Sequence, residues 1–377
     1  MTKPSTEAAV PRAASALRWL RARLFSSWSN ALATLAILYL AWKTVPPLIE
    51  WALVRAVWAP QNASLCREAI GHGACWAFVA DKYRFILFGT FPADQHWRPG
   101  LAIAILIALY ALSGLRRARR SWLISLWLTG LTAIGVLMGG GLFGLSHVEN
   151  ERWGGLTLTL LLATFGIGFA FPLSILLALG RRSDMPLVRW LCVAYIELIR
   201  GVPLISVLFM ASVMLPLFLP AGVFVDKLLR AQLAMILFAA AYLAEVVRAG
   251  LQAIPRQQEE AAQALGHGYW QRTWYVILPQ ALRIAIPPLV NTFIGFFKDT
   301  SLVVIIGLFD FLTTIKVALT EPAWSGFGVE AYLFAALGYF IFCYPMSRYS
   351  QALERQGAHG RGMGALRGAG RGSNLYL

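Results

Sequence analysis

Residues 101–115 read LAIAILIALYALSGL, and residues 116–120 continue with RRARR. A helix of about 20 apolar residues is long enough to cross the hydrocarbon core of a bilayer, which is about 30 Å thick. The apolar run stops at four arginines, and positively charged residues collect on the cytoplasmic side of a membrane. This stretch therefore predicts a membrane span at 99–115 that ends at the cytoplasmic surface.

Similar apolar runs recur along the chain and set the predicted fold class. Of the 377 residues, 58% are apolar and only 14% are charged, which leaves too little polar surface for a soluble protein. We predict an all-α membrane protein in the lipid bilayer, with about eight transmembrane helices and an interfacial helix at 187–199. The predicted spans are 30–50, 99–115, 122–145, 155–179, 203–219, 231–250, 285–308 and 330–347.

The basic residues indicate how these spans are oriented. The formal net charge is +15, but the arginines lie at the ends of apolar runs rather than on a soluble face, which excludes nucleic acid as a partner. If both termini lie in the cytoplasm, the arginines at 116–120, 181–182, 256 and 272 all face inward. The outer loops that follow the third and fifth spans then hold few basic residues. The first span is predicted to remain uncleaved.

Two cysteines, Cys66 and Cys75, share a polar loop predicted at 55–98. If that loop is periplasmic, the oxidising compartment allows them to form a disulfide, and two free thiols are the alternative. A zinc site would need two more ligands at a recognisable spacing. We therefore predict no metal site.

One polar segment, 251–280, differs from the other connections between spans. Its residues 255–279 read PRQQEEAAQALGHGYWQRTWYVILP. Pro255 is suited to the start of a helix, the alanines favour its middle, and Gly266 supplies the left-handed residue that ends one. A second short helix is predicted to stop before Pro279. This pattern predicts a rigid helix–turn–helix across the cytoplasmic mouth, and a plain amphipathic linker is the alternative.

The spacing within this segment resembles the EAA signature of ATP-binding-cassette importer permeases. The matching residues are Glu260, Ala261, Ala262, Gly266, Leu278 and Pro279, with Val276 where the signature has isoleucine. Four other stretches are similar to the polar amino-acid branch of that family: WGGLTLT at 153–159, ELIRGVP at 197–203, AEVVRAG at 244–250 and KDTSL at 298–302. The first 150 residues are similar to the three-span extension of general or acidic amino-acid permeases from Gram-negative bacteria.

This resemblance implies a domain plan. Residues 1–29 would be a cytoplasmic basic N-terminus, and 30–150 a three-span extension that contains the periplasmic loop 55–98. Residues 151–350 would form a five-helix permease core with the cytoplasmic coupling loop 251–280. Residues 351–377 are predicted to be a flexible Gly/Arg-rich tail.

The resemblance also implies a function and a set of partners. The chain would be the permease subunit of an amino-acid importer in a bacterial inner membrane, paired with a second homologous permease as a heterodimer. Two copies of an ATP-binding subunit would dock on the six signature residues, and a periplasmic amino-acid-binding protein would deliver the substrate. The chain has no phosphate-binding loop, so we expect ATP and Mg²⁺ to bind the partner ATPase, no cofactor to bind this chain, and no enzymatic activity of its own.

Two charged residues fall within a predicted span. Lys298 and Asp299 are costly in hydrocarbon and are candidate functional residues for that reason. Asn291 lies on the same helix face as Asp299, and Thr300 and Ser301 add hydroxyl groups. These residues are predicted to line the substrate path, with an interhelical ion pair or polar packing at the subunit interface as the alternative.

Two further charge pairs have i,i+3 spacing, Glu197 with Arg200 and Glu245 with Arg248. Each pair can close on one helix surface. We predict that they are structural ion pairs near the inner gate.

An ion-coupled secondary amino-acid transporter remains the alternative function. It would need no ordered coupling segment, and it often shows internal repeats, which are not evident between the two halves of this sequence. The sequence does not establish which amino acids are carried.

Overall fold

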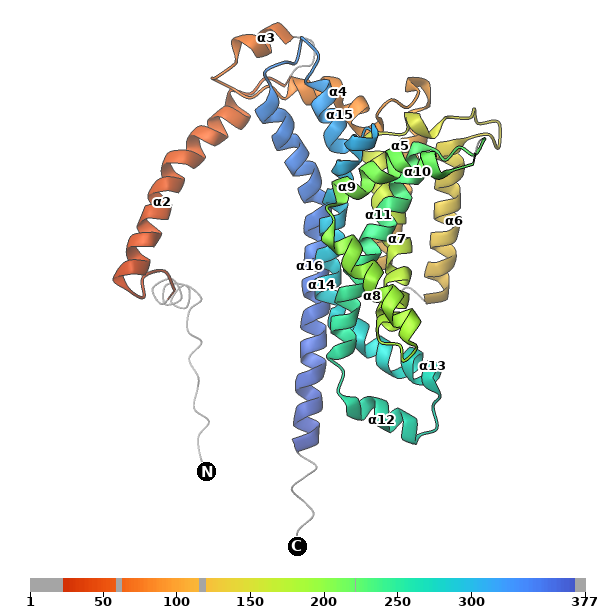
Figure 1. Cartoon of the computed structure of the whole chain (residues 1–377). Helices are drawn as coiled ribbons and strands as arrows, with labels where there is room; N and C mark the ends of the chain where they lie inside the picture. The colour runs from red at the N-terminus through yellow and green to blue at the C-terminus, as the bar shows by residue number, and fades with distance from the viewer. Residues whose placement is uncertain (1–22, 59–62, 115–119, 221, 370–377) are drawn as a thin grey trace. The chain divides into compact units, whose positions relative to one another are not determined.

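The computed structural model describes residues 23–58, 63–114, 120–220 and 222–369 (Figure 1). Within these ranges every named element is a helix. The chain divides into two compact units, Met1–Ala80 and Asp81–Leu377, which are described separately. The predicted cytoplasmic anchor at 116–120 lies mostly outside the described residues.

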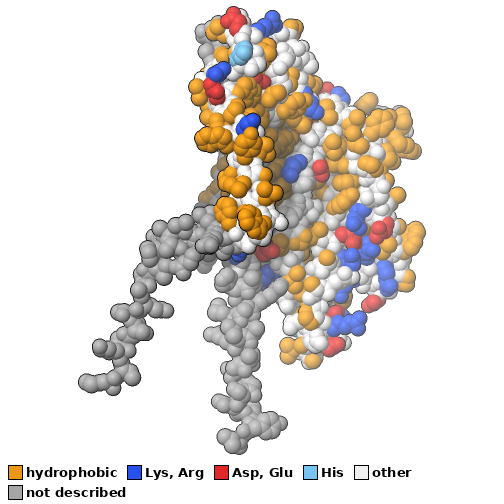
Figure 2. All heavy atoms as spheres, turned by 90° about the vertical axis from the view of Figure 1, so that its left-hand side faces the viewer, with side chains coloured by type: hydrophobic (Ala, Val, Ile, Leu, Met, Phe, Trp, Pro, Cys, Tyr) orange, Lys and Arg blue, Asp and Glu red, His pale blue; other side chains and the backbone are white. Residues whose placement is uncertain are grey.

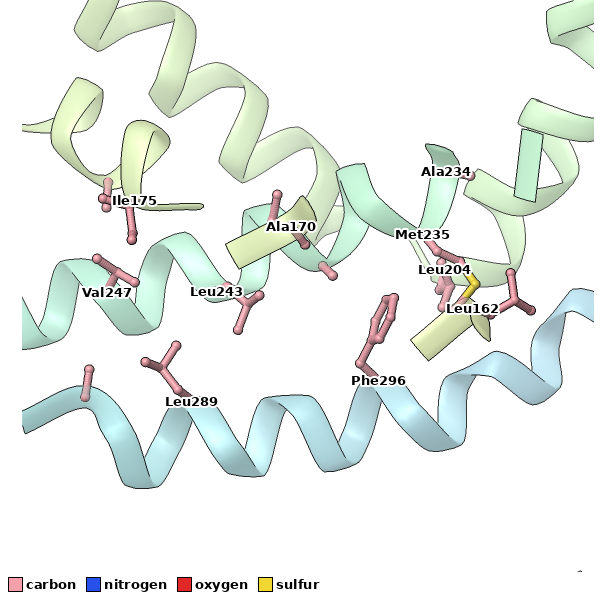
Figure 3. Close-up of a cluster of buried hydrophobic side chains, with 14 of the residues drawn as sticks. Leu162, Ala170, Ile175, Leu204, Ala234, Met235, Leu243, Val247, Leu289 and Phe296 are labelled. Atoms are coloured by element: carbon pink, nitrogen blue, oxygen red, sulfur yellow. The ribbon is translucent and has the colours of Figure 1, made fainter. Parts of the chain in front are cut away.

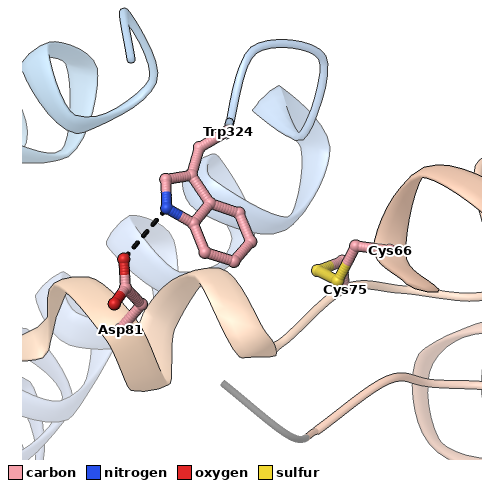
Figure 4. Close-up of a disulfide and its surroundings, with 4 residues drawn as sticks. All are labelled: Cys66, Cys75, Asp81 and Trp324. Carbon is pink, nitrogen blue, oxygen red and sulfur yellow. Dashed lines mark hydrogen bonds between the residues drawn. A yellow bond between two sulfur atoms is a disulfide. The ribbon is translucent and has the colours of Figure 1, made fainter. Parts of the chain in front are cut away.

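The first unit contains one long apolar helix and a small disulfide-closed segment. Helix α2 (Trp28–Ile49) begins at Ser27, whose hydroxyl accepts a hydrogen bond from the backbone N–H of Asn30. The helix continues through two prolines into a π-helical turn, Glu50–Val54. Short helix α3 (Ala63–Glu68) follows, and Cys66 and Cys75 form a disulfide (Figure 4).

The predicted polar loop 55–98 is largely helical, which corrects the sequence-based expectation. Besides α3 it contains α4 (Ala77–Phe88) and a 3₁₀ turn, Ala93–Gln95. Charged residues in this stretch led to the prediction of a loop. In the structure two of them lie on α4 and contact residues far along the chain. Asp81 accepts a hydrogen bond from the indole N–H of Trp324 at 2.9 Å (Figure 4), and Lys82 lies 2.6 Å from Glu321.

The second unit begins with an antiparallel helix pair. Helices α5 (Trp97–Gly114) and α6 (Arg120–Gly139) pack against each other. Helix α6 ends earlier than the predicted residue 145, because Gly140 and Gly141 adopt φ values of 70° and 80°. Such left-handed conformations favour glycine and end a helix.

The core of the second unit is a three-helix layer (Figure 1). Helix α11 (Lys227–Gln252) packs against both α7 (Gly155–Arg181) and α14 (Leu278–Asp299). Their buried faces meet in one apolar cluster, which includes Leu162, Ala170, Ile175, Ala234, Met235, Leu243, Val247, Leu289 and Phe296 (Figure 3). Gly250 allows the two backbones to approach, because a Cβ there would lie 2.6 Å from the carbonyl oxygen of Ala281.

Shorter helices complete this unit. Helix α8 (Pro186–Gly201) is followed by a second helical stretch, Leu204–Phe218. This stretch consists of α9 (Leu204–Phe209), a π-helical turn at Met210–Met214 and α10 (Leu215–Phe218). The axis of α8 and the axis of the second stretch are bent by 104° relative to each other. The bend falls at Val202 and Pro203, both with extended backbones, as the Gly-Val-Pro sequence predicts. Helix α15 (Phe311–Ala318) precedes α16 (Gly328–Ala369), which continues into the predicted tail 351–377.

The segment between α11 and α14 contains two helical pieces, but the second does not stop before Pro279. Helix α12 (Arg256–Ala264) ends in a turn, and α13 (Tyr269–Gln271) then continues through a π-helical turn, Arg272–Ile277, directly into α14. The predicted stop is therefore wrong. Pro279 lies in the first turn of α14, immediately after the widened π turn, where its missing N–H interrupts the hydrogen-bond ladder least.

The number of long apolar helices agrees with the predicted number of membrane spans. Among the described residues, seven helices are long and apolar enough to cross a membrane, or eight if the bent pair Pro186–Gly201 and Leu204–Phe218 counts as one span. Apolar side chains cover much of the face shown in Figure 2, while several charged side chains gather in its lower right part. A surface of this kind is suited to lipid rather than to water.

Candidate functional site

Helix α12 is the exposed part of the polar segment, which we call the coupling segment (residues 251–280). Its N-cap Pro255 has an extended backbone, and the chain reverses at Gly266 with a φ of 80°. Gly268 then begins α13, and its N–H donates to the side chain of Gln271 at 3.0 Å. The turn residues therefore fix where α12 stops and where the continuous helix starts.

The signature residues divide between two faces of the coupling segment. Ala262 and Leu278 are buried against the unit, whereas Glu260, Ala261 and Pro279 are exposed. The small side chain of Ala261 allows another surface to approach α12 closely. Glu260 and Ala261 are therefore open to solvent, and Ala262 anchors the helix to the unit.

Polar contacts tie α12 to the helix that follows it. Arg272 lies 3.5 Å from the carboxylate of Glu259 and donates to the side chain of Gln263 at 3.3 Å. Gln280 also reaches the side chain of Gln258 at 3.4 Å. A displacement of α12 would therefore act directly on the helix that becomes α14.

A second group of charged residues surrounds Glu245 near the end of α11. The carboxylate of Glu245 accepts from Arg248 at 2.8 Å and from Arg181 at 2.7 Å, and Arg200 lies 3.8 Å away. These partners come from α11, α7 and α8 respectively. We call Glu245, Arg181, Arg200, Arg248 and Glu197 the Glu245 cluster.

Within this cluster, one sequence-predicted pair forms and the other does not. Glu245 and Arg248 contact each other across one helical turn, but Glu197 lies 3.0 Å from Arg181 and not beside Arg200. The i,i+3 spacing correctly predicts that Glu197 and Arg200 share one face of α8. It gives no information about a partner on another helix, such as Arg181. Arg181 was not a candidate, although an arginine in the last turn of a span is a usable signal.

The predicted path residues lie at the far end of α14. Asn291 and Lys298 are exposed, and Asp299 is partly buried. Thr300 is buried and its hydroxyl donates to the carbonyl oxygen of Phe297 at 2.8 Å. Thr300 therefore caps the end of α14. Ser301 follows in the 3₁₀ turn Thr300–Ile306 and is partly buried.

A buried carboxylate, Asp310, was not identified from the sequence. It accepts hydrogen bonds from the N–H groups of Leu312 and Thr313 at 3.0 and 3.1 Å and from the Thr313 hydroxyl, and so caps α15. Burial raises the pKa of Asp310, although these hydrogen bonds partly oppose the effect. The run Asp-Phe-Leu-Thr-Thr is an N-cap signal that could have revealed this residue.

No group of three or more His, Cys, Asp or Glu side chains in the described ranges is arranged to hold a metal ion. The fold and the coupling segment together define a multi-spanning helical membrane protein that carries an ordered polar segment between the spans Lys227–Gln252 and Tyr269–Ile306. Residues 170–356 match the family model described as the inner membrane component of binding-protein-dependent transport systems. The chain belongs to this family.

Relatives support the assignment over most of the chain. An inner membrane amino-acid ABC transporter permease of Escherichia coli K12, YhdY, is 51% identical over 93% of this chain and 97% of its own length. A glutamate/glutamine/aspartate/asparagine transport system permease of Rhodobacter capsulatus, BztC, is 39% identical with the same coverage. The glutamate/aspartate import permease GltK of Escherichia coli O6:H1 is 36% identical, over 54% of this chain and 92% of its own length.

Family membership confirms the expected class. The chain is a multi-pass inner-membrane component of an ATP-binding-cassette importer, and it is a transport subunit rather than an enzyme. Its family works with a separate ATPase and a substrate-binding protein. The secondary-transporter alternative is not favoured.

Proposed function

We propose that this chain forms one half of the translocation path of an amino-acid importer. The observation that supports this proposal most strongly is the continuous helix from α13 through α14, because it leads from the polar contacts that hold α12 into a membrane span without a break. The amino-acid assignment draws on the names of YhdY and BztC.

In this proposal the coupling segment receives the ATPase. Glu260 and Ala261 form the contact surface, Ala262 and Gly266 fix the geometry of α12, and Leu278 and Pro279 mark where the movement enters α14. ATP and Mg²⁺ bind to the ATPase, present in two copies, and no cofactor binds this chain. Both termini and the coupling segment face the cytoplasm, as the distribution of arginines favours.

The partner permease in this proposal is an unlike homologue, so that the two chains form a heterodimer. GltK matches only 54% of this chain but over nearly all of its own length, so permeases with and without an N-terminal extension both occur. A heterodimer needs the extension on one subunit only. A periplasmic amino-acid-binding protein delivers the substrate on the opposite side of the membrane.

Two residue groups act on the substrate path in this proposal. Asp299, with Lys298, Asn291 and Ser301 nearby, offers polar groups to a zwitterion within the span. The Glu245 cluster holds α7, α8 and α11 together at the end of the path next to the coupling segment. It is therefore placed to act as an inner gate.

The test is uptake of labelled amino acids by proteoliposomes that contain this chain, its co-purifying partners and the binding protein. We expect ATP-dependent uptake by the wild type and an assembled but inactive complex for Glu260→Ala. Gln257→Ala, on the same helix, is the matched control and should transport normally. Uptake that persists without ATP and follows an ion gradient would overturn the proposal.

Asp299→Asn tests the substrate path separately. If Asp299 contacts the substrate, the variant assembles and hydrolyses ATP, but its uptake falls. If the complex fails to assemble, Asp299 belongs to the subunit interface instead.

A further inference from the structure

A pocket of about 220 Å³ lies within the coupling segment, between α12 and the end of α7. Its walls come from the end of α7, the end of α11, helix α12 and the π-helical turn before α14. The lining residues are Arg182, Leu251, Ile254, Pro255, Arg256, Glu259, Glu260, Gln263, Arg272 and Ile277. Pockets for drug-sized ligands measure about 300–1,000 Å³, so this one is suited to a smaller, polar molecule.

Some charged side chains that line this pocket lack ion-pair or hydrogen-bond partners among the described residues. Arg256 and Glu260 are four residues apart on one face of α12, about 5–6 Å between Cβ atoms, yet neither makes an ion pair or hydrogen bond with any other described residue. Arg272 adds a further sign of incomplete pairing. Its Nε is buried and makes no hydrogen bond, although it lies 3.5 Å from Glu259.

We propose that this pocket binds a free α-amino acid on the coupling-segment side of the membrane. The carboxylate would pair with Arg256 and with the buried Nε–H of Arg272, which makes no hydrogen bond to Glu259, and the ammonium would pair with Glu260. Only a ligand with both charges satisfies both unpaired groups of α12, because a simple anion leaves Glu260 without a partner and a simple cation leaves Arg256 without one.

The effect of this binding on transport rests on the proposed function, because it requires the chain to be part of an amino-acid importer. Arg182, whose guanidinium donates to the carbonyl oxygen of Leu251 at 3.4 Å, forms the wall opposite α12. A bound amino acid would therefore connect α12 to α7 and would occupy Glu260, which the ATPase also needs. Accumulated amino acid would thus slow its own import.

The first experiment measures binding of labelled L-glutamine to the whole importer in nanodiscs, without the binding protein. We expect saturable binding that acetate or methylamine alone does not displace. Arg256→Gln should raise the Kd by about tenfold or more, because a charge-assisted contact is lost. Arg283→Gln removes an exposed arginine outside the pocket and should bind as the wild type does. Absence of binding, or equal binding by both variants, would overturn the proposal.

The second experiment separates this site from the transport path. Proteoliposomes are loaded with ATP and unlabelled L-glutamine, and uptake of labelled L-glutamine is started by external binding protein. Internal L-glutamine should slow uptake by the wild type and by Arg283→Gln but not by Arg256→Gln. Uptake that does not respond to internal L-glutamine would overturn the feedback role. A preparation that takes up no amino acid at all would contradict the proposed function instead. The binding assay would then still show whether the pocket binds an amino acid.

Discussion

At the scale of single residues, the charged groups of this protein act through partners on other helices. Glu245 offers the clearest case, because its side chain is only 15% exposed and lies within reach of three arginines. Removing a carboxylate from such a position leaves the cations uncompensated, which costs more than the pair itself contributes.

We therefore expect Glu245→Gln to lower the stability of the chain by about 2–4 kcal/mol. Glu197→Gln is the matched control, because Glu197 is 55% exposed and forms its ion pair with Arg181 at the rim of the cluster, and it should cost less than about 1 kcal/mol. The measurement is the midpoint of thermal unfolding in nanodiscs. Equal effects of the two variants would show that Glu245 does not organise the cluster.

Asp310 leads to a prediction about pH. Because burial raises its pKa above the ordinary value of 3.8, the folded chain holds this proton more tightly than the unfolded chain does. The contribution of Asp310 to stability is therefore greatest at low pH and is lost as the pH rises from 3.8 through the raised folded pKa. Asp310→Asn keeps a side-chain acceptor for the cap and should remove this dependence.

The comparison for Asp310 is between two curves of unfolding midpoint against pH. All other carboxylates contribute to both curves, so their difference isolates Asp310. Wild-type and variant curves that run parallel through the acid range would contradict the prediction.

These residues also show where sequence-based prediction ends. The Glu245–Arg248 contact could be predicted because both residues lie on one helix, at a spacing that helix geometry fixes. The contact between Glu197 and Arg181 could not, since it depends on how α7 and α8 pack. Asp310 was not predicted because it caps a short helix between two spans, where hydropathy gives no sign of a separate element.

At the scale of elements, the turn at Gly266 controls the shape of the coupling segment. A Cβ at Gly266 would meet open space, but the φ of 80° is a left-handed conformation that a side chain disfavours. At Gly268 the φ is −67° and a Cβ would find its nearest neighbour at 3.9 Å. The two glycines therefore differ in backbone conformation rather than in available space.

We expect Gly266→Ala to destabilise the turn by about 1 kcal/mol and to lower the ATPase rate that the assembled importer shows with its binding protein. Gly268→Ala should leave that rate unchanged. Both variants are measured as complexes with the ATPase. Loss of activity in Gly268→Ala alone would mean that close approach of a partner, and not backbone strain, explains the glycines.

The elements also differ in how well the sequence predicts them. Spans such as α7 and α11 are long apolar runs, so hydropathy alone placed them. Helix α4 was missed because Asp81 and Lys82 interrupt its apolar pattern, and their partners, Trp324 and Glu321, lie far along the chain. The continuity across Pro279 was missed because a π turn cannot be recognised from residue types.

At the scale of the whole molecule, the large apolar cluster of the described residues lies within the second unit. Its buried residues run from Leu158 to Leu308, so the first unit contributes none of them. Helix α5 is attached to this core by side-chain contacts, including the hydrogen bond between Tyr110 and Thr164 at 3.0 Å, and α6 packs on α5. We therefore expect the second unit to fold without the first.

A chain that starts at Ala77, and so keeps α4 whole, should remain monodisperse in detergent and unfold cooperatively. A chain that starts at Gly155 loses the contacts of α5 and α6 and should be less stable. Size-exclusion chromatography and thermal unfolding distinguish the two. Aggregation of the chain that starts at Ala77 would show that the first unit is needed to fold the second.

The unbroken helix from Tyr269 to Ile306 also sets the scale of movement. Its α-helical part, α14, has 22 residues and is therefore about 33 Å long, enough to span the hydrocarbon core. If α14 pivots near one end, a tilt of about 10° carries the other end through about 6 Å. Small displacements imposed by the ATPase would then be magnified at the opposite surface, where the substrate enters.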